Sequence, residues 1–252
     1  KELERLEREN PEHFDINSPT QRVGGDITKS FNTSVHNTPM YSLDNSYSLE
    51  DLKEWEKRIK KIIDSPVEYT CELKFDGVSI NLTYKDGELL RAVTRGDGVK
   101  GDDVTSNVKT IPTVPLKLRE NIRGEFEARG EIVMPLDGFN QLNKKRTEKG
   151  EEPFKNPRNT ASGSLKLQDS KEVSERPLEC LLYSVEDSKL FNNHIQFLEN
   201  AKSFGFNIYD NYKCSNSLDE IFEFIEYWEK NRSNLPFEID GVVLKVNDFY
   251  QR

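Results

Sequence analysis

The chain has 252 residues, 34% of them hydrophobic and 10% aromatic, which suits one large domain or a domain and a half and argues against intrinsic disorder. Its 36 Lys and Arg are outnumbered by 45 Asp and Glu, giving a net charge of −9, so it is not a protein that coats DNA by charge alone. The three cysteines Cys71, Cys180 and Cys214 are scattered and odd in number, which predicts a reduced, cytoplasmic protein without a zinc site, and no apolar run approaches the ~20 residues of a membrane span.

The N-terminal segment predicts a helix followed by a long loop. Residues 1–10 are charged throughout, with Leu3 and Leu6 on one stripe, which is typical of the end of a helix stopped by Pro11 and not of a signal peptide. Residues 17–38 are rich in Ser, Thr, Asn, Gly and Pro, which predicts a loop and a domain boundary near residue 30. A helix with nothing before it suggests a chain cut from a longer protein.

The rest of the chain predicts helices and strands in irregular alternation. Apolar residues at helical spacing predict helices over 48–63, 135–149, 195–204 and 217–230. Ser48 can cap the first of these, and Asp51 three residues later makes an acidic variant of the capping box. Apolar and β-branched runs predict strands over 68–83, 89–94, 126–134, 178–185 and 237–246, with a hairpin turn at Asp86-Gly87. Frequent hairpins favour an α+β fold of mixed or antiparallel sheets flanked by helices over a doubly wound parallel sheet.

The segment Cys71-Glu72-Leu73-Lys74-Phe75-Asp76-Gly77 carries the most informative pattern. Side chains of a strand alternate between its faces, so Glu72, Lys74 and Asp76 share one face and the apolar residues share the core face. Charges paired on a solvated strand are the commoner outcome of such a pattern. A lysine between two acids also fits a nucleophilic amine. Because an amine must lose its proton before it attacks, such a site must stabilise the neutral amine or offset the charge that arrives on its partner.

Two further segments place charges where a ligand could bind. Residues 94–98 form a tight turn that sets Arg95 beside two glycines, whose backbone can approach a ligand closely. The alternative is a simple turn. The strand over 126–134 puts Glu127, Arg129 and Glu131 on one face, which is equally typical of a surface charge ladder.

The last predicted strand repeats the Asp-Gly-Val of the lysine segment. Simple alternation would put Asp240 and Lys245 on opposite faces. Gly241 inside the strand predicts a bulge that could bring both side chains inward. The alternative is a buried strand with charges at its ends.

A basic stretch stands out in this acidic chain. It comprises Lys144, Lys145, Arg146, Lys155, Arg158 and Lys166. Residues 156–166 are loop-like and then helical, and such a segment can bind phosphates through Arg, Lys and a helix N-terminus. A solubilising basic surface is the alternative. The histidines His13, His36 and His194 are scattered, so we predict neither a zinc site nor a Ser-His-Asp arrangement.

Together these segments resemble the adenylation (nucleotidyltransferase) domain of bacterial NAD-dependent DNA ligases. The resemblance runs from residue 18 to residue 247. It rests on SPTQRVG at 18–24, HNTPMYSLDN at 36–45, ELKFDG at 72–77, TRGDG at 94–98, RGE at 129–131, NPRN at 156–159 and DGVVLK at 240–245. A lone Lys-x-Asp-Gly is a weak signal, but this ordered set is highly specific. The first block and NPRN separate it from ATP-dependent ligases and capping enzymes.

The resemblance implies an ATP-grasp-like nucleotidyltransferase domain over 31–252, truncated at its C-terminus. Residues 1–30 would be a remnant of the helical N-terminal domain that binds nicotinamide mononucleotide, with its linker. Lys74 would attack the adenylyl phosphorus of NAD⁺, release nicotinamide mononucleotide and carry AMP for transfer to the 5′-phosphate of nicked DNA. Because most of the flanking domains are missing, we expect no nick sealing by this chain alone and weakened self-adenylation.

The resemblance also assigns the other site residues. The nucleotide would contact Glu72 on its adenine side with Ser42 and Leu43 nearby, Arg95 and Glu131 near the ribose and phosphate, and Lys245 at the reacting phosphate. Hydrated Mg²⁺ (or Mn²⁺) would be held by Asp76, Glu131 and Asp240, in keeping with a cation that retains waters. Arg158 and Lys166 would face the DNA backbone. The family usually has Arg at the last position, and Lys166 loses bidentate phosphate binding.

The implied cofactors and partners follow from the same resemblance. NAD⁺ is the AMP donor, Mg²⁺ or Mn²⁺ the metal, and zinc belongs only to the full-length enzyme. The partners are nicked double-stranded DNA, in the full-length enzyme, and small molecules at the adenosine site, with no membrane contact and a monomeric chain. The setting would be the bacterial cytoplasm, with activity at the nucleoid in DNA replication and repair.

Two other functions stay open at this point. One is a nucleotidyltransferase that uses ATP, either a ligase or a capping enzyme, which an adenylation assay with ATP would reveal. The other is a catalytically silent DNA-binding or scaffold module, which would bind DNA in a salt-sensitive way without depending on nucleotide.

Overall fold

The computed structural model describes residues 2–13, 15, 17–22, 30–120, 122–186 and 191–252. The strands are β1 (Thr33–Val35), β2 (Tyr69–Phe75), β3 (Val78–Lys85), β4 (Glu88–Thr94), β5 (Lys100–Asp102), β6 (Glu125–Val133), β7 (Glu179–Val185), β8 (Tyr212–Ser215) and β9 (Ile239–Val246). The α-helices are α1 (Glu2–Glu9), α2 (Leu49–Ile59), α3 (Thr105–Val108), α4 (Leu136–Glu148), α5 (Pro157–Leu165), α6 (Ser170–Ser174), α7 (His194–Phe204) and α8 (Leu218–Asn231). Short 3-10 helices are η1 (Pro11–His13), η2 (Pro19–Gln21), η3 (Arg232–Asn234) and η4 (Phe249–Gln251).

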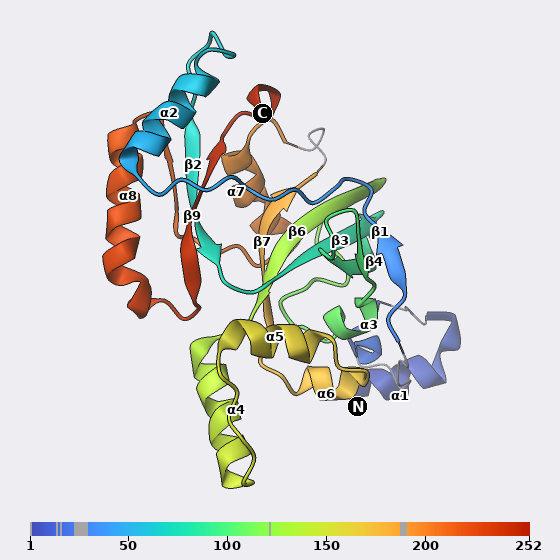
Figure 1. Cartoon of the computed structure of the whole chain (residues 1–252). Coiled ribbons are helices and arrows are strands. Elements are labelled where there is room, and N and C mark those ends of the chain that lie inside the picture. The colour runs from blue at the N-terminus through green and yellow to red at the C-terminus, as the bar shows by residue number, and fades with distance from the viewer. Residues whose placement is uncertain (1, 14, 16, 23–29, 121, 187–190) are drawn as a thin grey trace.

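The larger sheet has the strand order β4-β3-β6-β7, and every pairing is antiparallel. Its inner face carries fully buried side chains such as Ile80, Leu82, Tyr84 and Ile132. They join a core that also includes buried residues of α3, α5, α6 and α7. In Figure 1, α5 and α6 lie across one end of this sheet and α4 projects away from the body.

The smaller sheet has the order β8-β2-β9, so the strand with Lys74 is the central one. Helices α2 and α8 lie together on one side of this sheet in Figure 1. Trp55 of α2 packs on Tyr69 with ring centroids 5.1 Å apart, and Ile221 of α8 is fully buried in the same cluster. The central strand is therefore held on both edges and covered on one face.

The chain passes from the smaller to the larger sheet at Asp76-Gly77. The sequence predicted one strand over 68–83, and this prediction is wrong, because β2 and β3 belong to different sheets. A Cβ built on Gly77 would lie 2.3 Å from the carbonyl oxygen of Ile132 in β6. Only glycine lets the crossing chain approach the backbone of the larger sheet so closely. An apolar cluster of Phe75, Val133, Leu181, Phe237 and Tyr209 joins the two sheets beside this crossing.

Other differences from the sequence predictions are local. The helix expected over 48–63 ends at Ile59, although its expected capping box of Ser48 and Asp51 is confirmed. The segment over 156–166 becomes helical directly at Pro157, with Asn156 as the N-cap. Short elements such as β1, β5, α3, α6 and β8 were not predicted. Part of the expected loop over 17–38, namely 23–29, lies outside the described residues.

The α+β fold with antiparallel sheets and flanking helices is confirmed. Helix α1 buries none of its residues. Arg22, which follows the N-terminal helical segment, donates to the carbonyl oxygens of Lys109, Ile111 and Val114 and fastens this segment to the body. Within the described residues, no helix is both long and apolar enough to span a membrane.

Candidate functional site

Lys74 and Asp240 form an ion pair at the centre of the candidate site. The ammonium donates to both carboxylate oxygens, with Nζ 2.8 Å from Oδ1 and 2.6 Å from Oδ2. The register between β2 and β9 shifts here, because Lys74 pairs with Gly241 and Phe75 pairs with Ile239. Asp240 is thus the extra residue of a β-bulge, which turns it toward Lys74. The bulge expected at Gly241 is confirmed.

A second pair of charges lies beside the crossing between the sheets. Arg158, in the first turn of α5, donates from Nη1 to Asp76 Oδ1 at 2.8 Å. Glu131 comes from the larger sheet, where it pairs with Ser79 in the β3–β6 register. Burial raises the pKa of Glu131 to about 8, and the positive charges of Lys74 and Arg158 offset only part of this effect. The structure therefore brings Glu131 of the larger sheet close enough to Lys74 of the smaller sheet for the two charges to interact.

The three carboxylates expected to bind a metal do not form a ligand set. Asp240 is held by Lys74, and Asp76 by Arg158, while the half-buried Glu131 has a pKa raised by desolvation. Over the described ranges of the chain, no three His, Cys, Asp or Glu side chains lie where they could hold one ion. The residues are hard oxygen donors of the type Mg²⁺ prefers, but as arranged they do not fit a metal.

Glu72, two residues before Lys74, lies in a buried polar cluster that the sequence did not predict. Its Oε1 is 2.9 Å from Lys245 Nζ and 2.7 Å from His194 Nε2. Lys245 also donates to the carbonyl oxygen of Tyr183 at 2.7 Å. The resemblance assigned Lys245 to the reacting phosphate, but its ammonium contacts the residue expected at the adenine. Nothing in the spacing of the sequence could have found His194, which is 122 residues from Glu72.

Electrostatics keep this cluster in one protonation state. Burial alone would raise the pKa of Glu72, but the charge of Lys245 and hydrogen bonds from Lys245 and His194 outweigh it and lower the value to about 2. Burial and the charge of Lys245 lower the pKa of His194 to about 4. At neutral pH the carboxylate is ionised and the imidazole neutral. A nitrogen 2.7 Å from a carboxylate oxygen must carry a proton, which assigns the proton to Nε2.

The neutral buried state of His194 predicts a pH dependence of stability. Between pH about 7 and about 5 the unfolded chain protonates this histidine and the native chain does not, so native stability should fall by roughly 2 kcal/mol at this group. The groups that act on it are Glu72, Lys245 and Arg252. Glu131 contributes with the opposite sign, because its pKa is raised to about 8 and the native chain binds its proton first.

Urea unfolding of the wild type and of His194→Gln at the two pH values isolates this term, since Glu131 is common to both proteins. We expect the wild type to lose roughly 2 kcal/mol relative to the variant on going to the lower pH. The matched control is His13→Gln, at a histidine whose side chain is 80% exposed. Equal losses in all three proteins would mean that His194 titrates normally.

The segment at 36–42 is clamped against the larger sheet. Glu127 accepts hydrogen bonds from the backbone N–H groups of Asn37 and Thr38 at 3.1 and 3.2 Å. Arg129 donates to the carbonyl oxygens of Thr38 and Pro39 and pairs with Glu186. Glu127 and Arg129 are 4% and 9% exposed. The surface charge ladder is therefore excluded, and these two residues position the segment that leads to Ser42.

The turn at 94–98 holds the far end of that segment. Arg95 donates from Nη2 to Ser42 Oγ at 2.7 Å, and the N–H of Met40 donates to the carbonyl oxygen of Gly98 at 2.7 Å. Gly98 has a φ of +92° and its Cβ position is 2.9 Å from the carbonyl oxygen of Met40. Leu43 follows with 59% exposure. The structure thus brings Arg95 and Ser42 together and leaves Leu43 open to solvent.

The expected DNA contacts lie in two different settings. Arg158 is bound to Asp76 within the site. Lys166, at the C-terminus of α5, pairs with Asp102 of β5 at 2.7 Å. Arg146 of the basic stretch lies in the last turn of α4 and contacts the loop that follows, where it pairs with Glu151 and lies over the ring of Phe154.

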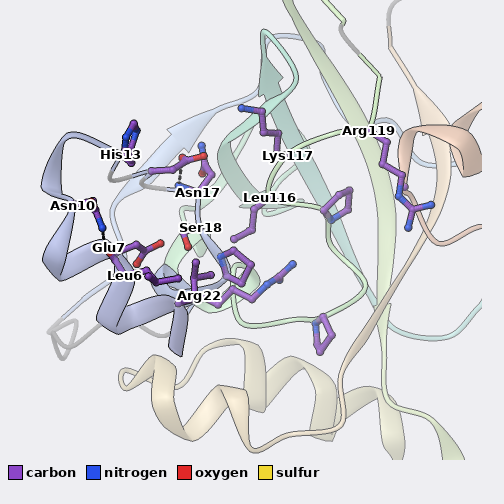
Figure 2. Close-up of a pocket in the computed structure, with 16 residues that line it drawn as sticks. Leu6, Glu7, Asn10, His13, Asn17, Ser18, Arg22, Leu116, Lys117 and Arg119 are labelled. Carbon is purple, nitrogen blue, oxygen red and sulfur yellow. Dashed lines mark hydrogen bonds between the residues drawn. The ribbon is translucent and has the colours of Figure 1, made fainter. Parts of the chain in front are cut away.

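A surface pocket of about 900 Å³ lies away from these residues. Figure 2 shows it between the N-terminal helical segment and the loop around Leu116, with Leu6, Arg22 and Lys117 on its walls. None of the residues at 36–42, 72–77 or 238–245 lines this pocket. It is separate from the candidate site.

Comparison with known proteins adds a family and close relatives. Residues 28–252 match the family model described as the NAD-dependent DNA ligase adenylation domain. Over 251 residues the chain is 57% identical to a DNA ligase of Flavobacterium psychrophilum, and this alignment covers 99% of the chain. It is 55% identical to a DNA ligase of Christiangramia forsetii and 53% identical to one of Flavobacterium johnsoniae, over its full length in both cases. The chain spans 38% of the length of these relatives.

Proposed function

Because the chain belongs to the family of NAD-dependent DNA ligase adenylation domains, we propose that Lys74 is the nucleophile that takes AMP from NAD⁺. The observation that carries this proposal is the ion pair of Lys74 with the bulged Asp240. It holds a primary amine, 42% exposed, on the central strand of the smaller sheet.

The proposed reaction is a single displacement at phosphorus. The lone pair of Lys74 Nζ forms a bond to the adenylyl phosphorus, and the bond from that phosphorus to the bridging oxygen breaks. Nicotinamide mononucleotide leaves with the electron pair. The amine must give up a proton and leave Asp240 before it attacks, and the carboxylate of Asp240 is the nearest group that can receive that proton.

The nucleotide would lie along the strand face shared by Glu72 and Lys74. Residues two apart on a strand are separated by about 7 Å, so a base at Glu72 and a phosphorus at Lys74 fit one nucleotide. We assign Glu72 and Lys245 to the base end, since Lys245 pairs with Glu72. Ser42, Leu43, Arg95 and Glu131 would line the remaining nucleotide surface, with Arg95 holding Ser42 in place.

A dependence on Mg²⁺ or Mn²⁺ is proposed from the family resemblance only. Asp76, Glu131 and Asp240 do not fit a metal as they are arranged, so no step of the chemistry is assigned to one. Binding of a cation would require the pairs Lys74–Asp240 and Arg158–Asp76 to open.

The wider assignments also belong to this proposal. The nucleotidyltransferase domain, of ATP-grasp-like type, would comprise 31–252, and 1–30 would belong to a preceding helical domain. In the whole ligase, AMP would pass to the 5′-phosphate of nicked DNA, with Arg158 and Lys166 near the DNA backbone. Both would first have to leave their acidic partners. We propose that the protein acts as a monomer in the bacterial cytoplasm.

Intact-mass measurement of the purified chain, before and after NAD⁺ with Mg²⁺, tests this function. We expect a gain of one AMP group on a single site and, with ATP in place of NAD⁺, no gain. A gain with ATP but not with NAD⁺ would favour an ATP-using nucleotidyltransferase. If neither donor gives a gain, covalent transfer by this chain is contradicted, and salt-sensitive DNA binding without nucleotide would favour the silent module.

A further inference from the structure

His194 is a buried polar residue that the proposed chemistry does not use. It is fully buried at the start of α7, and its Nδ1 has no hydrogen-bond partner in the described part of the chain. Leaving a buried polar atom unpaired is destabilising. The polar contacts that the structure gives to the ring are those of Nε2 with Glu72 and Lys245. The imidazole therefore contacts its polar surroundings through Nε2, while its unpaired Nδ1 is destabilising.

Two donors converge on one oxygen of Glu72. His194 Nε2 lies 2.7 Å and Lys245 Nζ 2.9 Å from Oε1. The other oxygen, Oε2, has no partner among the residues that the structure describes, and the side chain keeps 10% exposure. One oxygen is thus saturated, and the other is left as an acceptor for a ligand.

The two donors, His194 and Lys245, are connected through Asn247. The N–H of His194 donates to the carbonyl oxygen of Asn247 at 2.9 Å, and the N–H of Ile195 donates to Asn247 Oδ1 at 3.0 Å. Asn247 directly follows β9, which carries Lys245. The start of α7 is therefore tied to the strand that brings the second donor, and the two donors reach Glu72 in fixed relation.

We propose that His194 is a positioning residue, which holds Glu72 so that Oε2 alone faces the base and accepts a hydrogen from the 6-amino group of adenine. This inference rests on the proposed function, which puts the base at Glu72. An ionised acceptor in a fixed orientation favours a base with an amino group at that position over one without it. His194 would then act on base discrimination without touching the ligand.

The test compares AMP with purine riboside 5′-monophosphate, which lacks the 6-amino group, by calorimetric titration of the whole chain. Hydrogen bonds to charged groups contribute about 1.5–3 kcal/mol, so we expect the wild type to prefer AMP by at least about 10-fold. His194→Leu should reduce the preference to about 2-fold. His194→Gln, whose amide nitrogen can replace Nε2, should restore most of it.

A merely structural role of His194 would not change this preference. Leu198→Ala is the matched control, because Leu198 is 1% exposed in the same helix and apolar. It should lower stability and leave the ratio of the two affinities unchanged. If His194→Leu keeps the wild-type ratio, or if Leu198→Ala lowers it equally, the positioning role is overturned.

Glu72→Gln separates the inference from the function on which it rests. With both donors directed at the Oε1 position, the amide oxygen must take that place and the NH₂ group must face the ligand. AMP should then lose its advantage over the analogue. If the wild type shows no preference for AMP, or if Glu72→Gln keeps the preference, the base is not at Glu72. The placement of the base in the proposed function and the positioning role of His194 then both fail. If Glu72→Gln loses it and His194→Leu does not, only the role of His194 fails.

Discussion

The Lys74→Arg variant should gain no AMP at all when it is incubated with NAD⁺ and Mg²⁺. Arginine keeps a positive charge opposite Asp240, so the ion pair with the bulge can still form. Its guanidinium is not deprotonated in proteins and supplies no nucleophilic lone pair. The loss should therefore be complete, with the fold unchanged. Intact mass and peptide mapping measure the first, and thermal unfolding the second.

A control variant and the exposure of the ion pair make the result of this experiment interpretable. Lys85→Arg makes the same substitution at an exposed lysine at the end of β3, and this variant should take up AMP like the wild type. The pair at Lys74 is 42% and 38% exposed, so its contribution to stability is no more than about 1 kcal/mol. Retention of an adduct by Lys74→Arg would show that another residue is the nucleophile.

Gly77→Ala should destabilise the chain by more than about 3 kcal/mol, because the new methyl group meets backbone and not a movable side chain. The Cβ would lie 2.3 Å from the carbonyl oxygen of Ile132 and 3.0 Å from side-chain atoms of Glu131 and Val133. Strand β6 is paired on both edges, with β3 and β7, so it cannot yield. Denaturant unfolding measures the loss.

The same substitution at Gly163 should have the opposite sign. Gly163 is exposed in α5, and nothing lies within 4 Å of its Cβ position. Alanine in place of glycine in a helix interior stabilises by up to about 1 kcal/mol. Free energies of unfolding that agree within about 0.5 kcal/mol for the two variants would mean that the crossing at Gly77 is not sterically closed.

The sequence predicted those features that depend on neighbours along the chain. Alternation put Glu72 and Lys74 on one face, Gly241 marked the bulge, and Ser48 with Asp51 marked the start of α2. In each case the physical cause is local, because backbone geometry or a cap three residues away decides it. The α+β class follows from the same local patterns.

Features decided by distant contacts could not be predicted in this way. Asp76-Gly77 is an Asp-Gly pair like the one at Asp86-Gly87, and the prediction of one continuous strand passed over this turn signal. The close approach of Gly77 to the backbone of β6, about 55 residues later, could not be predicted from it. Glu127 and Arg129 fitted a surface ladder equally well until their bonds to 37–39 were known. His194 is an isolated histidine in the sequence, and only packing of α7 beside β9 brings it to Glu72.

The position of β2 between β8 and β9 also bears on how the chain folds. Lys74 and Asp240 are 166 residues apart, and both partners of the central strand come from the last quarter of the chain. Pairings between such distant segments close large loops and form slowly. During synthesis β2, which carries Lys74, leaves the ribosome before β8 and β9, so it stays unpaired until both of these strands have emerged. We therefore expect the Lys74–Asp240 pair to be assembled in the final stage of folding, after the larger sheet.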